Sequence, residues 1–153
     1  MPNLILKMLM PWRTEAPRVA VVRLSGVIAA VGRLGSGLSI AGISQTLDKA
    51  FAIKPAAVAL DINSPGGSAA QSHLIFKRIR ALAAEKKLPV FAFVEDVAAS
   101  GGYMIACAAD EIFADETSIL GSIGVISSSF GFTELIGKLG VERRVYTAGE
   151  HKG

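Results

Sequence analysis

Short runs of β-branched and aromatic residues alternate with longer stretches rich in Ala and Leu from Pro17 to the end of the chain. The short runs are typical of strands, and the longer stretches repeat apolar positions at helical spacing. This pattern predicts strands at residues 19–28, 56–62, 89–95, 111–114 and 143–147. It also predicts helices at residues 40–51, 69–84 and 133–139, and a short helix that ends before Asp110. Such alternation indicates an α/β fold of stacked βα units around a sheet covered on both faces.

Segments rich in Gly and Ser separate these elements, at residues 32–37, 64–68, 99–102 and 117–129. The segments at 64–68 and 99–102 each follow a predicted strand and open a predicted helix. In open α/β sheets, ligands bind at the edge where parallel strands end, so these two turns are the places to look for chemistry. The helix at 69–84 is expected to bury an apolar stripe formed by Leu74, Ile75, Ile79 and Leu82.

The composition is that of one compact domain. With 51% hydrophobic and 19% charged residues, the 153-residue chain has apolar material for one core and is too short for two. A net charge of only +3 excludes a disordered chain. The single Cys107 cannot form an internal disulfide, and together with two histidines it supplies too few ligands for a structural zinc site. We expect an N-terminal stub at residues 1–16 and one domain at residues 17–153.

Hydropathy and charge bear on membrane insertion, secretion, nucleic-acid binding and localisation. The longest charge-free stretch, residues 117–133, contains five Ser and three Gly, which is typical of turn-rich packed backbone and not of a membrane span. The apolar first ten residues are interrupted by Lys7 and lack the features of a secretory signal. The basic residues lie on expected solvated faces without interleaved aromatics, so no nucleic-acid partner is expected. The sequence favours a cytoplasmic protein or one in peripheral contact with the inner membrane of a bacterium.

The two glycine-rich turns each allow two interpretations. The turn SPGG at residues 64–67 suits an oxyanion hole, because paired glycines adopt φ > 0 and let a ligand approach the main chain. An ordinary tight turn has the same composition. Ser100, within AASGG at residues 98–102, suits a nucleophile because its small neighbours leave room for a substrate. It equally suits an N-cap, whose hydroxyl accepts a hydrogen bond from an amide of the first helical turn.

A serine nucleophile needs a base. His73 falls inside the predicted helix at 69–84, where a surface or packing role is the simpler interpretation, and His151 lies near the end of the sequence. Lys152 follows the last predicted strand, in a loop that glycines bound on both sides. An unperturbed lysine has a pKa of about 10.4, and burial lowers such a pKa by up to about 3 to 5 units. An enclosed Lys152 could therefore act as a base, while a solvated terminal lysine is the alternative.

Five motifs in order, DINSPGGS, AASGGY, AADEIFA, GSIGV and TAGEHK, make the chain similar to the signal peptide peptidase A family of serine peptidases. The similarity extends from about Val19 to the C-terminus. It implies a crotonase-like (Clp-protease-like) fold and hydrolysis of hydrophobic peptides, such as signal peptide remnants, by a Ser-Lys dyad. By matching motif, Ser100 is the nucleophile and Lys152 the base, the amides of Gly67 and Gly101 form the oxyanion hole, and Ser122 orients the lysine. The resemblance further implies a homo-oligomer and no metal, nucleotide or other cofactor.

The chain differs from relatives of the same fold. The proteolytic subunit of the Clp protease places a histidine downstream of its serine, whereas residues 118–124 here read SILGSIG. Crotonase-type hydratases use acidic residues near such turns, and the nearby Glu95 and Asp96 are most simply a solvated strand end. Two alternatives to a peptidase therefore remain, namely a catalytically incompetent oligomerisation or scaffold module and an acyl-CoA-handling crotonase relative.

The resemblance also raises an expectation about length. Members of the family continue past the lysine loop with further helices, whereas this sequence ends one residue after Lys152. A base so close to a chain end is poorly buried. We therefore expect a C-terminally truncated domain that lacks its C-terminal helices and has weak or no peptidase activity by itself.

Overall fold

The computed structural model describes residues 16–30, 37–124, 126, 128–142 and 144. Its centre is a parallel sheet in the order β1 (Val19–Ser25), β2 (Ala57–Ser64), β3 (Val90–Ala99) and β4 (Glu111–Ala114). A fifth strand, β5 (Ile119–Gly121), pairs in parallel with the last residues of β3. Parallel strands require crossover connections, and helices supply the first three of them. The described chain is an α/β protein, as the sequence pattern predicts.

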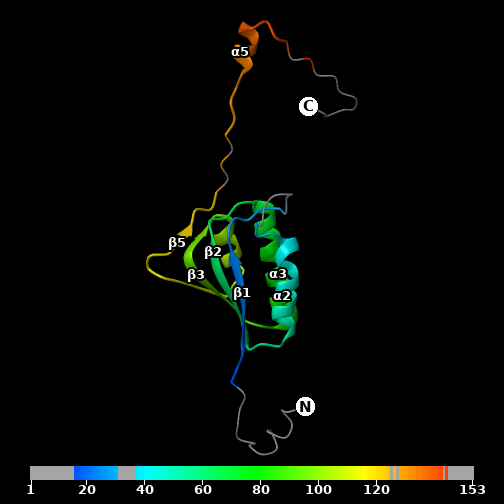
Figure 1. Ribbon diagram of the computed structural model, residues 1–153, viewed down its shortest axis with the longest axis vertical. Helices are drawn as coiled ribbons and strands as arrows, with labels where there is room; N and C mark the ends of the chain where they lie inside the picture. The colour runs from blue at the N-terminus through cyan, green and yellow to red at the C-terminus, as the bar shows by residue number, and fades with distance from the viewer. Residues whose placement is uncertain (1–15, 31–36, 125, 127, 143, 145–153) are drawn as a thin grey trace, which may run out of the picture.

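Two long helices, α2 (Ile40–Ala52) and α3 (Ala69–Lys86), lie side by side on one face of the sheet (Figure 1). The short helix α4 (Gly101–Ala106) packs against α3 and against β2 and β3. Each long helix begins at a serine whose hydroxyl accepts an amide of the first turn, Ser39 for α2 and Ser68 for α3. These caps explain why both helices begin close to the residues predicted from periodicity.

The core lies between the sheet and the two long helices. The residues of β1 alternate between exposed and buried, while those of the central β2 are buried at almost every position. Helix α3 buries Ile75, Ile79 and Leu82 as expected, but Leu74 is 46% exposed, so its predicted place in the stripe is wrong. Leu74 is one residue, about 100° of rotation, from Ile75, which places it outside the face that packs on the sheet.

The opposite face of the sheet carries exposed apolar side chains in the described part of the chain, against the expectation of cover on both sides. Val21 is 66% exposed, and Phe93 and Phe113 stack on each other with ring centroids 5.1 Å apart.

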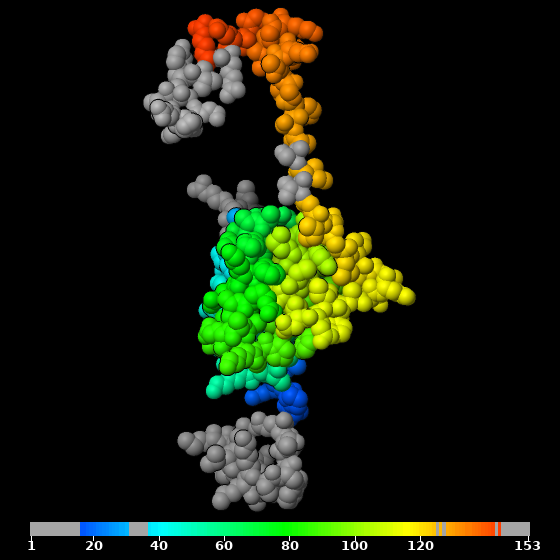
Figure 2. Space-filling view, turned by 180° about the vertical axis from the view of Figure 1, so that it is seen from behind, coloured from blue at the N-terminus to red at the C-terminus, as the bar shows by residue number. Residues whose placement is uncertain are grey.

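Beyond β5, residues of the described segment extend away from the body of the domain to the short helix α5 (Thr133–Lys138) (Figure 2). Among the described residues, no helix is long and apolar enough to cross a membrane.

Most predicted elements are confirmed, and the differences lie near the two glycine-rich turns. The first strand ends at Ser25 because Gly26 turns the chain with φ +95°, and Ile28 then forms isolated bridges with Leu38 and Gly67. Strand β3 runs four residues past the predicted end at Glu95, since its small last residues pair with the unpredicted β5. The predicted strand at 143–147 falls outside the described residues apart from Arg144.

Asp110 fixes the start of β3 and gives a pH-dependent contribution to stability. One carboxylate oxygen accepts the Val90 N–H at 2.9 Å, and the other accepts Arg80 Nη1 at 2.9 Å. The Val90 hydrogen bond and then the Arg80 partner lower the pKa of Asp110 below its ordinary 3.8. A carboxyl group with a lowered folded-state pKa stabilises the fold above its ordinary pKa, and this contribution is lost as the pH falls through the folded-state value.

Replacing Asp110 with asparagine is therefore expected to lower the free energy of unfolding at pH 7 by about 1 kcal/mol, a value kept small because the side chain is partly exposed. At pH 3 the difference between the two proteins should shrink. Urea unfolding at both pH values measures it. An equal difference at pH 7 and pH 3 would contradict the assigned role of the Asp110 charge.

Candidate active site

Ser100 joins β3 to α4 with a backbone conformation that L-residues rarely adopt. Its φ of +52° and ψ of −117° lie outside the regions allowed for a residue with a side chain. The surrounding structure holds this conformation, because the Ser100 N–H donates to the carbonyl oxygen of Gly121 on β5 at 2.7 Å. Such strain costs about 1 to 3 kcal/mol and clusters at active sites.

The side chain of Ser100 does not cap the helix that follows it. Ser100 stands at the N-cap position of α4, yet its hydroxyl makes no capping hydrogen bond with an amide of that helix. Helix α3 begins differently, because Ser68 uses its hydroxyl to accept the Gln71 N–H. The interpretation of Ser100 as an ordinary N-cap is therefore wrong. Ser100 is half-buried at the end of β3, and its hydroxyl has no partner among the described contacts.

The two glycine-rich turns meet beside Ser100. A Cβ atom added to Gly66 would lie 2.6 Å from the Ala99 carbonyl oxygen, 2.8 Å from the Gly101 nitrogen and 2.9 Å from the Ser100 Cβ. The backbone of the first turn thus packs directly on the backbone of the second. This approach requires glycine, and the φ of +95° at Gly66 requires it independently.

Two backbone amides near the serine have no acceptor among the described contacts. Ile28 donates to the Gly66 carbonyl at 2.8 Å and accepts from the Ser68 N–H at 2.7 Å, so the Gly67 peptide between them points away from Ile28. Among the described contacts, the Gly67 N–H has no acceptor. The Gly101 N–H belongs to the first turn of α4, where amides have no partner within the helix. Both predicted oxyanion-hole amides therefore lie on the turns that converge at Ser100.

Of the other residues considered as site residues, Ser122 and His73 are described by the structure. Ser122 is exposed, has φ +54°, and directly follows Gly121, whose carbonyl binds the Ser100 N–H. It therefore lies at the same end of the sheet. Lys152 and His151 lie outside the described residues. His73 is exposed on α3 and stacks on Phe76 with ring centroids 6.3 Å apart, which confirms its surface role.

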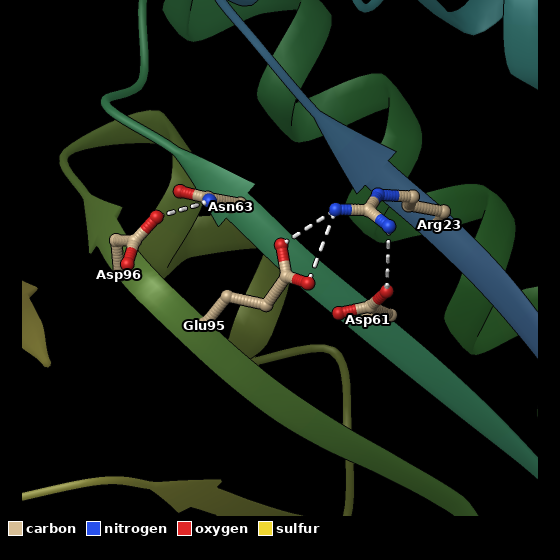
Figure 3. A network of polar contacts seen from close by, with 5 residues as sticks. All are labelled: Arg23, Asp61, Asn63, Glu95 and Asp96. Carbon is tan, nitrogen blue, oxygen red and sulfur yellow. Dashed lines mark hydrogen bonds and ion pairs between the residues drawn. The ribbon is translucent and has the colours of Figure 1, made fainter.

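The two acids near the turns take part in a polar network across three strands (Figure 3). Arg23 Nη2 donates to both carboxylate oxygens of Glu95, at 3.1 and 2.9 Å, and Arg23 Nη1 lies 3.9 Å from Asp61. Asn63 Nδ2 donates to Asp96 at 2.7 Å. The interpretation of Glu95 and Asp96 as a solvated strand end is wrong in part, because both are exposed but partnered, within β3. Sequence spacing gave no signal for this pairing of residues far apart in the chain.

The close packing of the turns makes a direct prediction for Gly66. Replacing it with alanine is expected to lower the free energy of unfolding by about 2 to 4 kcal/mol, since the new Cβ meets rigid backbone and φ +95° is strained for alanine. Urea unfolding measures the loss. The matched control is Gly131→Ala, where a Cβ meets nothing within 4 Å among described atoms and the expected change is within about 0.5 kcal/mol. Equal effects of the two substitutions would refute the packing argument.

Comparison with known proteins shows similarity to peptidases. Residues 82–153 match the family model of Peptidase family S49. The chain is 35% identical over 139 residues to the chloroplastic serine protease SPPA of Arabidopsis thaliana, covering 88% of this chain and 20% of that protein. It is 60% identical over 152 residues to a Brucella melitensis protein named Na(+)/H(+) antiporter NhaA, covering 97% of this chain and 21% of that protein. The chain thus spans about a fifth of the length of these curated relatives.

Solved structures share the fold. The 1510-N membrane protease specific for a stomatin homolog, from Pyrococcus horikoshii, superposes with a TM-score of 0.52 at 23% identity, over 70% of this chain and 50% of that one. ClpP1 of Listeria monocytogenes, as its N165D mutant, gives a TM-score of 0.51 at 19% identity, over 78% of this chain and 63% of that one. The sheet and its helices therefore define a Clp-protease-like α/β fold. Within that class, the match of residues 82–153 to Peptidase family S49 and the similarity to proteins named SPPA and SppA support the signal peptide peptidase A family.

Proposed function

We propose that this chain is the catalytic part of a serine-type peptidase in which Ser100 is the nucleophile and Lys152 the general base. The observation that supports this most directly is the backbone of Ser100, held at φ +52° with its hydroxyl unused by the helix it precedes. The free amides of the adjoining turns supply a second support. The match of residues 82–153 to Peptidase family S49 makes a peptide bond the expected target.

The proposed reaction gives each of these residues one role. Ser100 Oγ attacks the carbonyl carbon of the peptide while its proton passes to the neutral amine of Lys152. The oxyanion that forms accepts hydrogen bonds from the N–H groups of Gly67 and Gly101, each worth about 2.7 to 4 kcal/mol in the transition state. The lysine ammonium then gives its proton to the leaving amine. Water then attacks the ester carbonyl while Lys152 takes its proton, and the lysine ammonium returns that proton to Ser100 Oγ as the ester bond breaks and the acid product leaves. Ser122 hydrogen-bonds the lysine amine.

The surface around Ser122 supports a hydrophobic peptide as substrate. Ile119, Leu120 and Ile123 are exposed, and they flank Ser122 at the end of the sheet where Ser100 lies. An extended apolar peptide that runs along β5 would cover these side chains and could pair with strand backbone. Remnants of cleaved signal peptides have this chemistry, and relatives bear names of signal peptide peptidases.

Exposed apolar residues beyond β5 support a homo-oligomer. Phe130 and Leu139 are 87% and 68% exposed, and both lie in the segment that extends from the domain. A free apolar surface of this kind is typical of a contact with another chain. The Clp-protease-like fold agrees with assembly into larger particles. Peripheral membrane contact is a further expectation from the sequence.

The experiment that tests the peptidase is covalent labelling of the natural gene product with a fluorophosphonate probe. We expect one modified residue, Ser100, located by mass spectrometry of the digested protein, and hydrolysis of a fluorogenic apolar peptide that the probe inhibits. A folded protein that neither reacts with the probe nor hydrolyses peptides would instead favour the scaffold alternative. Turnover of an acyl-CoA thioester without peptide hydrolysis would favour the crotonase alternative.

A further inference from the structure

A completely buried serine connects the two halves of the candidate oxyanion hole. Ser64, the last residue of β2, has no exposed surface, and its hydroxyl forms two hydrogen bonds. It donates to the Gly26 carbonyl oxygen at 2.7 Å and accepts the Gly66 N–H at 3.2 Å. Of the two, the first joins the turn to the end of β1, and the second spans Pro65 and holds the turn itself.

The backbone of Ser64 also supports the helix that begins after the nucleophile. A Cβ added to Gly102 of α4 would lie 2.5 Å from the Ser64 carbonyl oxygen and 3.2 Å from the Ser64 Cβ. Ser64 therefore contacts the first turn of α4 on one side and the Gly66 turn on the other. Its hydroxyl thus bonds the turn of one proposed amide, and its Cβ and carbonyl oxygen pack beneath the helix of the other.

We infer that Ser64 is a positioning residue that sets the direction of the Gly67 N–H toward the carbonyl attacked by Ser100. This inference rests on the proposed peptidase function. When the Gly66 N–H is bound to the Ser64 hydroxyl, the Gly66 peptide cannot rotate, so the following peptide keeps its N–H away from Ile28. A hydroxyl suits this position because it donates one hydrogen bond and accepts another. The side chain of alanine does neither, and a thiol does both more weakly.

The role predicts a specific kinetic change for Ser64→Ala. The turn should lose its internal bond and the oxyanion hole its fixed geometry, while the surface that binds the peptide stays unchanged. We expect kcat for an apolar fluorogenic peptide to fall on the order of tenfold to a hundredfold, less than the loss of a whole oxyanion donor, with KM within about twofold. Exchange of the Gly66 amide, followed by NMR, should become at least about fivefold faster.

Ser39→Ala is the matched control. Ser39 is 2% exposed, and its hydroxyl likewise accepts one backbone amide, that of Gly42, but at the start of α2. Its loss should weaken the fold without changing kcat at a temperature where both proteins are folded. An equal fall of kcat in both variants, or an unchanged kcat and unchanged Gly66 exchange in Ser64→Ala, would overturn the inference.

Two further measurements keep the test decisive. If Ser64→Ala does not fold, Ser64→Cys takes its place, because a thiol nearly keeps the volume of the side chain but forms weaker hydrogen bonds. The kcat of Ser64→Cys should also fall, by a smaller factor. A wild-type kcat in folded Ser64→Cys would count against the inference. A wild-type protein without Ser100-dependent turnover would refute the proposed peptidase, and Gly66 exchange would then still report whether the Ser64 hydrogen bond holds the turn.

Discussion

Replacing Ser100 with alanine is expected to abolish fluorophosphonate labelling and to lower peptide hydrolysis on the order of a thousandfold or more, because alanine has no hydroxyl to form the acyl intermediate. The free energy of unfolding should stay close to the wild-type value, since alanine keeps the Cβ and meets the same φ of +52°. Labelling followed by gel fluorescence and urea unfolding measure the two effects. Persistent labelling of the folded variant would remove Ser100 from the reaction.

Ser100→Gly separates the chemistry from the strain at the same position. It should be as inactive as Ser100→Ala but at least as stable, because relief of about 1 to 3 kcal/mol of backbone strain offsets the entropy cost of glycine, about 0.5 to 1 kcal/mol. Ser122→Gly is the comparison, because Ser122 is exposed and has a similar φ of +54° but lies outside the β3–α4 junction. A Ser100→Gly protein clearly less stable than Ser100→Ala would show that the backbone there is not strained.

The sequence predicted the helices and most strands because their signals are local. Helix α2 repeats apolar residues along one face and has its capping serine next to it, and β4 is a short apolar run between polar residues. Strand β5 was not predicted, since its three residues lie in a segment rich in Ser and Gly. Its strand conformation depends on pairing with Val97–Ala99, a contact that no local pattern contains.

The candidate site was predictable to the same degree and for the same reason. Paired glycines mark the two turns and single out Ser100 in the sequence, and the family resemblance adds Gly67 and Gly101. The structure packs the backbone of Gly66 against that of residues 99–101. The strain at Ser100 and the hydrogen bonds of Ser64 could not be foreseen. The first depends on a carbonyl of β5, and the second on the Gly26 carbonyl, 38 residues away in the chain.

Replacing Lys152 with methionine is expected to lower kcat by about a hundredfold to ten-thousandfold, the usual contribution of general acid and base catalysis. Methionine keeps the length and apolar character of the side chain but has no amine to accept the Ser100 proton. Wild-type hydrolysis should rise with pH as the amine loses its proton, and the variant should lose this dependence. The pH profile of kcat for an apolar fluorogenic peptide, taken on the natural gene product, measures both effects.

The matched control for the base is His73→Ala. In a serine peptidase the alternative base is a histidine, yet His73 is exposed on α3, where its ring stacks on Phe76. Its replacement should leave kcat within about twofold of the wild type. A strong loss in His73→Ala together with full activity in Lys152→Met would refute the Ser-Lys mechanism. Loss in Lys152→Met alone would instead establish that the amine of Lys152, and not the imidazole of His73, is needed to accept the proton of Ser100.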